Sequence, residues 1–159
     1  MSTTTAAAPV TTTDRVPALR SALATRPVWL VGVAATVVAA VATALVAVVA
    51  KAADVPLQVV PSNGEGLETI PPSGFATMTL VGGAIGTVLA LALARWAKRP
   101  ARTFVVVTVV LALVSLASPL IAEDATTATR LVLELTHVVA AAIVIPAIAY
   151  RLARVTGSR

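Results

Sequence analysis

Glu134 and His137 are the residues of this chain whose types and spacing best suit chemistry. They lie three positions apart in the apolar segment RLVLELTHVVAAAIVIPAIAY (130–150), and His137 is the sole histidine. A spacing of three places both side chains on one face of a helix, with Arg130 one turn earlier on the same side. Ionisable residues inside a segment apolar enough for lipid indicate a functional site by default. Such a pair could titrate protons, bind a ligand or join a metal site.

A purely structural role for this candidate intramembrane site competes with those uses, and we favour it. Glu134 would pair with Arg130, and His137 would bond to a Thr or Ser of a neighbouring span, so that the cluster fixes helix register. A metal site completed by Glu123 or Asp124 is the weakest alternative, because one histidine and carboxylates make a poor donor set without a second His or any Cys. We therefore predict neither a metal nor a cofactor.

Four long apolar runs must position these residues. The chain of 159 residues is 58% hydrophobic and 12% charged, which is typical of an integral membrane protein. The runs cover residues 28–50, 75–94, 104–122 and 131–150, and each is long enough for a helix to cross a hydrocarbon core of about 30 Å. The predicted fold is all-α, a transmembrane bundle of four helices over residues 27–152. It follows a disordered Thr/Ala-rich tail (1–26) and precedes a basic tail (153–159).

The distribution of charge predicts the orientation of the bundle. Lys and Arg gather in the N-terminal tail, in the second loop RWAKRPAR and at the C-terminus, whereas the first and third loops carry most of the acidic residues. Because basic residues stay on the cytoplasmic side, both termini and the second loop should be cytoplasmic, in a multi-pass protein of the plasma membrane. The net charge of +5 is thus a topology signal and does not indicate nucleic acid. Four aromatic residues fall at the same inner boundary, as anchoring rings do: Trp29, Trp96, Phe104 and Tyr150.

Small and polar residues within the spans suggest how the helices pack. Gly82 and Gly86 have the GxxxG spacing beside Gly83, which lets helices approach closely in lipid. Ser115 and Ser118 can bond across helices or to backbone groups. In the fourth span, Pro146 predicts a kink. The long first loop (51–74) carries apolar residues among its prolines, so we expect it to pack over the outer mouth of the bundle.

Composition and motifs narrow the function to three classes. The chain has no cysteine, which excludes disulfide exchange and thiolate chemistry. We favour a non-enzymatic accessory, scaffold or envelope-associated subunit, with the lipid bilayer around it and a membrane protein or a second copy as partner. The first alternative is a small transporter or channel component with a ligand or proton site at Glu134 and His137. The second is a membrane-embedded enzyme using that pair as general acid and base, although no nucleophile motif or phosphate-binding loop accompanies it.

The last two spans carry a family resemblance. The segments FVVVTVVLALVSLASPL and LVLELTHVVAAAIVIPAIAYRL resemble a family of small actinobacterial four-span membrane proteins classed as a domain of unknown function. Its pattern has a Ser-Pro in the third span, then His-Val-Val and a later Ile-Pro in the fourth, which match His137 and Pro146. The resemblance covers about residues 28–152 and implies the architecture and source, with no activity attached.

Overall fold

Four helices and one short hairpin make up the described part of the chain. The structure, a computed structural model, describes residues 26–60, 66–120 and 125–156. Residues 1–25 of the tail that we predicted to be disordered (1–26) and residues 157–159 of the predicted basic tail (153–159) lie outside these ranges, whereas residues 153–156 belong to the last helix. In chain order the elements are α2 (Val28–Ala52), β1 (Gln58–Val59), β2 (Glu68–Thr69), α3 (Pro72–Trp96), α4 (Pro100–Leu120) and α5 (Thr127–Thr156).

The helical character of the predicted fold is confirmed, and three of the four described helices are long and apolar enough to span a membrane. These are α2, α3 and α5 (Thr127–Val155), whereas the apolar stretch of α4 counted in the same way, Pro100–Leu116, is shorter. Lengths and hydropathy of this kind indicate a membrane protein.

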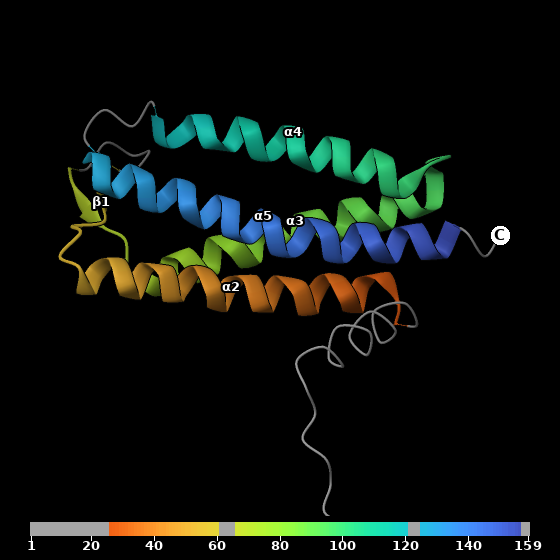
Figure 1. Ribbon diagram of the computed structural model, residues 1–159, viewed down its shortest axis with the longest axis horizontal. Helices are drawn as coiled ribbons and strands as arrows, with labels where there is room; N and C mark the ends of the chain where they lie inside the picture. The colour runs from red at the N-terminus through yellow and green to blue at the C-terminus, as the bar shows by residue number, and fades with distance from the viewer. Residues whose placement is uncertain (1–25, 61–65, 121–124, 157–159) are drawn as a thin grey trace, which may run out of the picture.

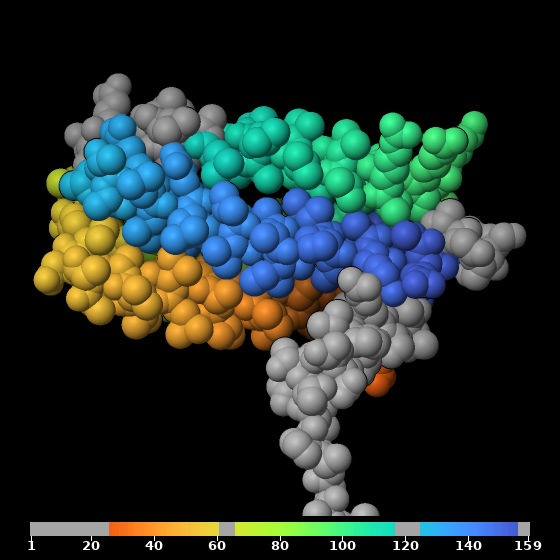
Figure 2. Space-filling view, viewed as in Figure 1, coloured from red at the N-terminus to blue at the C-terminus, as the bar shows by residue number. Residues whose placement is uncertain are grey.

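The helices run side by side in a bundle. In Figures 1 and 2, α2 forms one edge, α4 forms the opposite edge and α5 lies between them. Figure 1 shows α3 behind α5. The α2 helix packs against α3 and α5, whereas α4 packs mainly against α5 and less extensively against α3. Since α4 contacts the other helices on one side only, the space between α3, α4 and α5 is less completely filled than the α2–α3 contact.

Each described helix extends past its predicted apolar run at one end or at both. The α3 helix begins at Pro72, three residues before the run, because proline is well tolerated in the first turn, where its missing N–H costs no hydrogen bond. The α4 helix likewise begins at a proline, Pro100. The α5 helix begins at Thr127, and the hydroxyl of Thr126 accepts the backbone N–H of Thr129 at 3.2 Å, the geometry of an N-cap.

Glycine and threonine pairs bring α2 and α3 together. A Cβ added to Gly83 would lie 2.3 Å from the side chain of Thr36, and one added to Gly32 would lie 2.4 Å from Thr87. The backbones of the two helices therefore approach so closely that only glycine fits at positions 32 and 83. Closer to the hairpin, the hydroxyls of Thr43 and Thr79 are 3.0 Å apart.

Apolar clusters close the bundle at both ends. At the end where α2 begins and α5 ends, Phe104 packs with Ile148 and Leu152, and all three are fully buried. Phe104 is thus a core residue and not the boundary anchor that we predicted, because its ring turns into the bundle. Trp29 and Trp96 at that end are exposed, and Tyr150 accepts a hydrogen bond from Arg154 at 3.1 Å.

The first loop packs over the other end, as its apolar residues predict. Leu57 is 1% exposed and contacts the cluster of Ala47, Ala50 and Phe75. Its φ of 49° is unusual for a bulky residue, and it turns the chain into β1, which pairs with β2 through Gln58–Thr69 and Val59–Glu68. Much of the predicted turn sequence SNGEG falls in residues 61–65, outside the described part.

Candidate functional site between α3, α4 and α5

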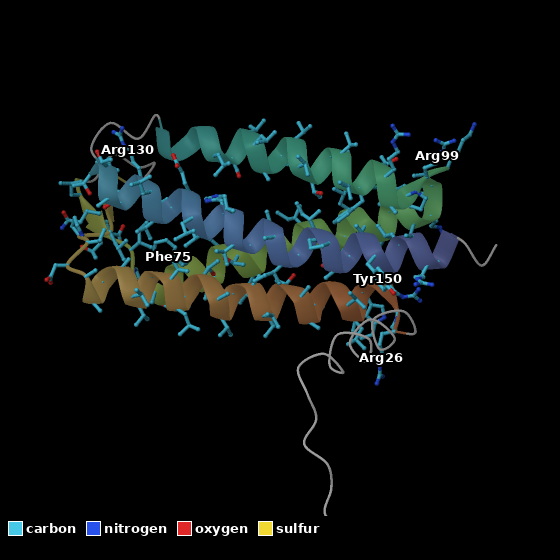
Figure 3. All side chains as sticks on the ribbon, viewed as in Figure 1. Arg26, Phe75, Arg99, Arg130 and Tyr150 are labelled. Atoms are coloured by element: carbon cyan, nitrogen blue, oxygen red, sulfur yellow. The ribbon has the colours of Figure 1, made fainter. Side chains whose placement is uncertain are left out.

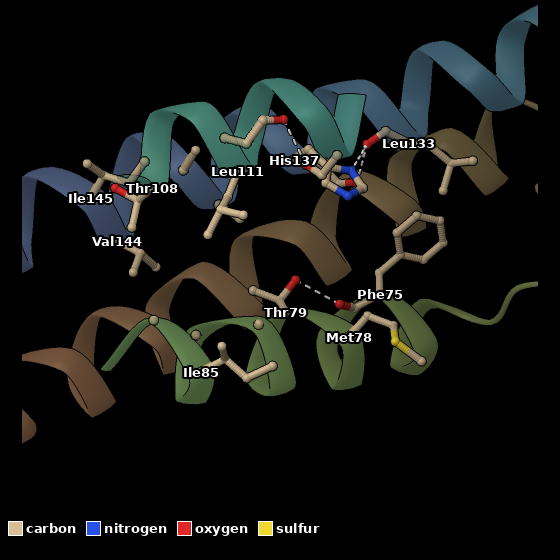
Figure 4. Close-up of a pocket in the computed structure, with 18 of the residues that line it drawn as sticks. Phe75, Met78, Thr79, Ile85, Thr108, Leu111, Leu133, His137, Val144 and Ile145 are labelled. Carbon is tan, nitrogen blue, oxygen red and sulfur yellow. Dashed lines mark hydrogen bonds between the residues drawn. The ribbon is translucent and has the colours of Figure 1, made fainter. Parts of the chain in front are cut away.

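His137 projects from α5 into the interior of the bundle, where it lines a cavity (Figure 4). Its Nδ1 lies 2.7 Å from the carbonyl oxygen of Leu133, one turn earlier in the same helix. We considered a bond to a Thr or Ser of a neighbouring span, and the ring bonds to its own helix instead. The same carbonyl also accepts the hydroxyl of Thr136 at 2.8 Å. These contacts fix the orientation of the imidazole ring.

Glu134 and Arg130 do not share the surroundings of His137. Glu134 is half-buried and lies outside the lining of the cavity, although it is only three residues away. Within the described residues, no ion pair joins it to Arg130. The structure therefore separates the predicted intramembrane cluster: His137 faces the cavity, whereas Glu134 and Arg130 do not line it.

The cavity has a volume of about 570 Å³ and is bounded by α3, α4 and α5. Its walls are largely apolar, with Phe75 and Met78 from α3, Leu111 from α4 and Val144 and Ile145 from α5, all labelled in Figure 4. His137 is the one ionisable residue among the described residues of this wall. Cavities of this size and composition are typical of sites for small hydrophobic ligands.

The hydroxyl groups of the wall are already occupied. Four Thr or Ser side chains line the cavity, and each donates to a carbonyl of its own helix, so none has a proton to offer a ligand. The bonds are Thr79 to Phe75 (2.8 Å), Thr108 to Phe104 (2.7 Å), Ser115 to Ala112 (2.8 Å) and Thr136 to Leu133 (2.8 Å). Ser115 thus bonds to the backbone, one of the two roles we considered, and the side chain of Ser118 lies outside the described part.

Gly82, Gly83 and Gly86 all line the cavity, and Gly83 also packs against Thr36 of α2. A Cβ at Gly82 or Gly86 would have no atom of the described structure within 4 Å outside its own helix. The two glycines of the GxxxG spacing therefore leave room on the cavity side of α3. The motif that sequence reasoning missed is GAIGT (83–87) facing GVAAT (32–36), which could have been found by searching both helices for glycine and threonine four apart.

One side of the cavity is open at the bundle surface. Met78, Ile85 and Leu111 all belong to its lining, yet they are 73%, 64% and 56% exposed. The opening thus lies between α3 and α4, which pack against each other less extensively than α4 and α5 do. If the helices are embedded in a bilayer, this opening faces lipid and not water.

Pro146 and the carboxylates considered for a metal site are the remaining predicted features. Pro146 lies inside α5, which continues as one helix to Thr156; the kink remains a prediction. Among the described residues, no group of three or more His, Cys, Asp or Glu could hold a metal ion. Glu123 and Asp124, the carboxylates considered for such a site, lie outside the described ranges.

Comparison with known proteins gives a family and no activity. The model of a family of unknown function (DUF6069) matches residues 23–154, and the chain therefore belongs to that family. No curated protein matches significantly, and no solved structure does.

Proposed function

We propose that this member of a family without an assigned activity is a non-enzymatic accessory protein of the cell membrane, which binds a hydrophobic molecule in the cavity between α3, α4 and α5. The observation that carries the proposal is the cavity itself. It combines a volume of about 570 Å³ with apolar walls and an opening lined by exposed Met78, Ile85 and Leu111. A water-soluble substrate would gain little binding energy from apolar walls, whereas a hydrophobic ligand could move from lipid into a cavity of suitable shape.

The proposal includes four membrane spans with both termini in the cytoplasm. The 21 residues of α4 give a helix of about 31 Å, which equals the thickness of the hydrocarbon core. Figure 3 supports the orientation: Arg26, Arg99 and Tyr150 lie at one end of the bundle and Arg130 lies at the other. Basic residues at one end are expected to face the cytoplasm.

The transporter and enzyme alternatives receive less support from the site. A pathway for ions or protons needs polar groups along its length. Between His137 and Phe104 the described cavity wall is apolar except for Thr108, whose hydroxyl donates to the carbonyl of Phe104. Acid–base catalysis by Glu134 and His137 needs both groups at one reacting centre, and only His137 lines the cavity.

Topology can be tested with single cysteines, because the natural chain has none. A Glu68→Cys variant should react with a membrane-impermeant maleimide in intact cells, whereas Lys98→Cys should react only after lysis. The reverse labelling pattern would contradict the orientation. Equal labelling of both positions in intact cells would contradict the four-span count.

Ligand binding can be tested by native mass spectrometry of protein extracted from its own membranes. Gly86→Leu places a side chain in the cavity, and Ala84→Leu, on an exposed position of α3 outside the cavity, is the matched control. We expect a hydrophobic adduct on the wild type and on Ala84→Leu, and its loss from Gly86→Leu. An adduct of equal occupancy on all three proteins would contradict the proposal.

A further inference from the structure

The hydrogen bond of His137 determines what its other ring nitrogen can do. The carbonyl oxygen of Leu133 can only accept, so Nδ1, at 2.7 Å from it, must carry a proton. In the neutral imidazole, Nε2 is then unprotonated and acts as an acceptor. Within the described residues Nε2 has no hydrogen-bond partner, and its ring lines the cavity. A ligand that pairs with Nε2 must therefore donate a proton.

The rest of the described wall offers a ligand no hydrogen-bond donor and no positive charge. The four wall hydroxyls give their protons to backbone carbonyls, as described above. No lysine or arginine lies among the described residues of the wall, so nothing there would balance a phosphate or other anionic head. A single neutral donor on an otherwise apolar molecule fits this wall.

The shape of the cavity fixes the direction of the ligand. On α5 the lining extends from Leu133 to Ile145, about 18 Å along the helix axis, and His137 lies about 6 Å from its hairpin end. At the other end Phe104, 0% exposed, closes the cavity together with the cluster around Ile148. A polar group at His137 thus leaves the longer part of the cavity for a hydrocarbon chain. The volume suits one chain and is too small for the body of a two-chain phospholipid.

We infer that the cavity takes a single-chain amphiphile with a hydroxyl head, whose O–H donates to Nε2 of His137 and whose chain extends towards Phe104. This inference rests on the proposed function, since it names the ligand class of the same cavity. The ligand enters between α3 and α4, past Met78 and Ile85, because the exposed part of the lining is there.

The test compares three probes that share one chain: myristyl alcohol, its methyl ether and myristic acid. Their binding is measured by native mass spectrometry and by thermal stabilisation at equal mole fraction in one detergent. Four proteins are compared: the wild type, His137→Phe, Gly86→Leu and Ala84→Leu. His137→Phe keeps an aromatic ring but removes the acceptor, and Gly86→Leu fills the cavity. Ala84→Leu is the control for partitioning of the probe into the micelle. The alcohol should bind the wild type about three- to tenfold more tightly than the ether, the range for one buried hydrogen bond. That preference should vanish in His137→Phe.

The remaining outcomes separate this inference from the proposed function. If alcohol and ether bind the wild type equally and both are lost in Gly86→Leu, the cavity binds apolar molecules but the hydroxyl assignment is overturned. If the acid binds best and depends on His137, Nε2 is a donor and the assignment is again overturned. If Gly86→Leu and Ala84→Leu behave alike with every probe, both proposals fail. Should His137→Phe not fold, the ratio of alcohol to ether in the wild type decides alone.

Discussion

Thr36 of α2 packs directly over Gly83 of α3, in the space where a Cβ at residue 83 would lie at 2.3 Å from the threonine side chain. The arrangement is repeated in reverse one turn away, where Thr87 of α3 packs over Gly32 of α2. Each helix thus contributes one glycine and one threonine, four residues apart, and the two pairs interlock because the helices are antiparallel. A shift of either helix along its axis would place threonine against a residue with a side chain.

Gly83→Ala should destabilise the protein, by about 1–3 kcal/mol, because the added methyl group overlaps Thr36 in a contact that has no free space. The free energy of unfolding in a detergent titration measures this cost. Gly82→Ala is the control, and it should remain within about 1 kcal/mol of the wild type, since its Cβ points into open space. Adding Thr36→Ala to Gly83→Ala should restore part of the loss, and strict additivity of the two changes would contradict the direct contact.

Thr36→Val should leave stability unchanged or raise it by up to about 1 kcal/mol. The hydroxyl of Thr36 is buried and has no hydrogen-bond partner among the described residues, and valine keeps the shape without the polar atom. Thr43→Val is the matched comparison and should cost about 0.6–1.7 kcal/mol, because the Thr43 hydroxyl lies 3.0 Å from that of Thr79. Equal losses for both variants, measured as midpoints of thermal unfolding, would argue against the difference between the two sites.

Glu134→Gln should leave the binding of a hydrophobic adduct unchanged. The carboxylate lies outside the cavity lining, so neutralising it changes neither the walls nor the hydrogen bond of His137. Adduct occupancy in native mass spectra, with His137→Phe measured in parallel, checks this expectation. Loss of the adduct in Glu134→Gln would restore the paired site that the sequence suggests.

Thr126→Ala should cost about 1 kcal/mol of stability by removing the hydroxyl that accepts the N–H of Thr129 at the start of α5. Thr127→Ala, at the next position, is the control, because Thr127 is exposed. Hydrogen exchange of the first turn of α5 gives the local readout. Equal protection in the two variants would show that the cap contributes nothing.

The length and hydropathy of the apolar runs predicted the helices well, but they could not predict which face of each helix meets which neighbour. All four apolar runs correspond to described helices, since the backbone in lipid must satisfy its own hydrogen bonds. Phe104 was assigned to the boundary because it starts an apolar run. Its burial depends on how α4 lies against α5, and sequence spacing does not contain that information.

The same limit applies to the candidate site, because sequence spacing does not say which side chains face a cavity. The sequence drew attention to His137, and the structure places it in a cavity wall. The i, i+3 spacing predicted that Glu134 would share a site with His137. Two side chains one turn apart nevertheless point in different directions, so one can line a given cavity without the other. The cavity itself depends on the spacing of three helices. Gly82 and Gly86 indicate a cavity only once the structure shows that the space beside them is empty.

Side-chain hydroxyls in the described helices mostly bond within their own helix, and this has a consequence for biosynthesis. A span that leaves the insertion machinery with its threonines bonded to its own carbonyls can meet acyl chains alone, before any neighbour arrives. Between described helices, the pair Thr43 and Thr79 is the one hydroxyl contact that has to await a partner. The later association of the spans therefore depends on the complementary shapes of the helix surfaces. A change in residue size at the α2–α3 contact should consequently impair assembly more than a change in polarity.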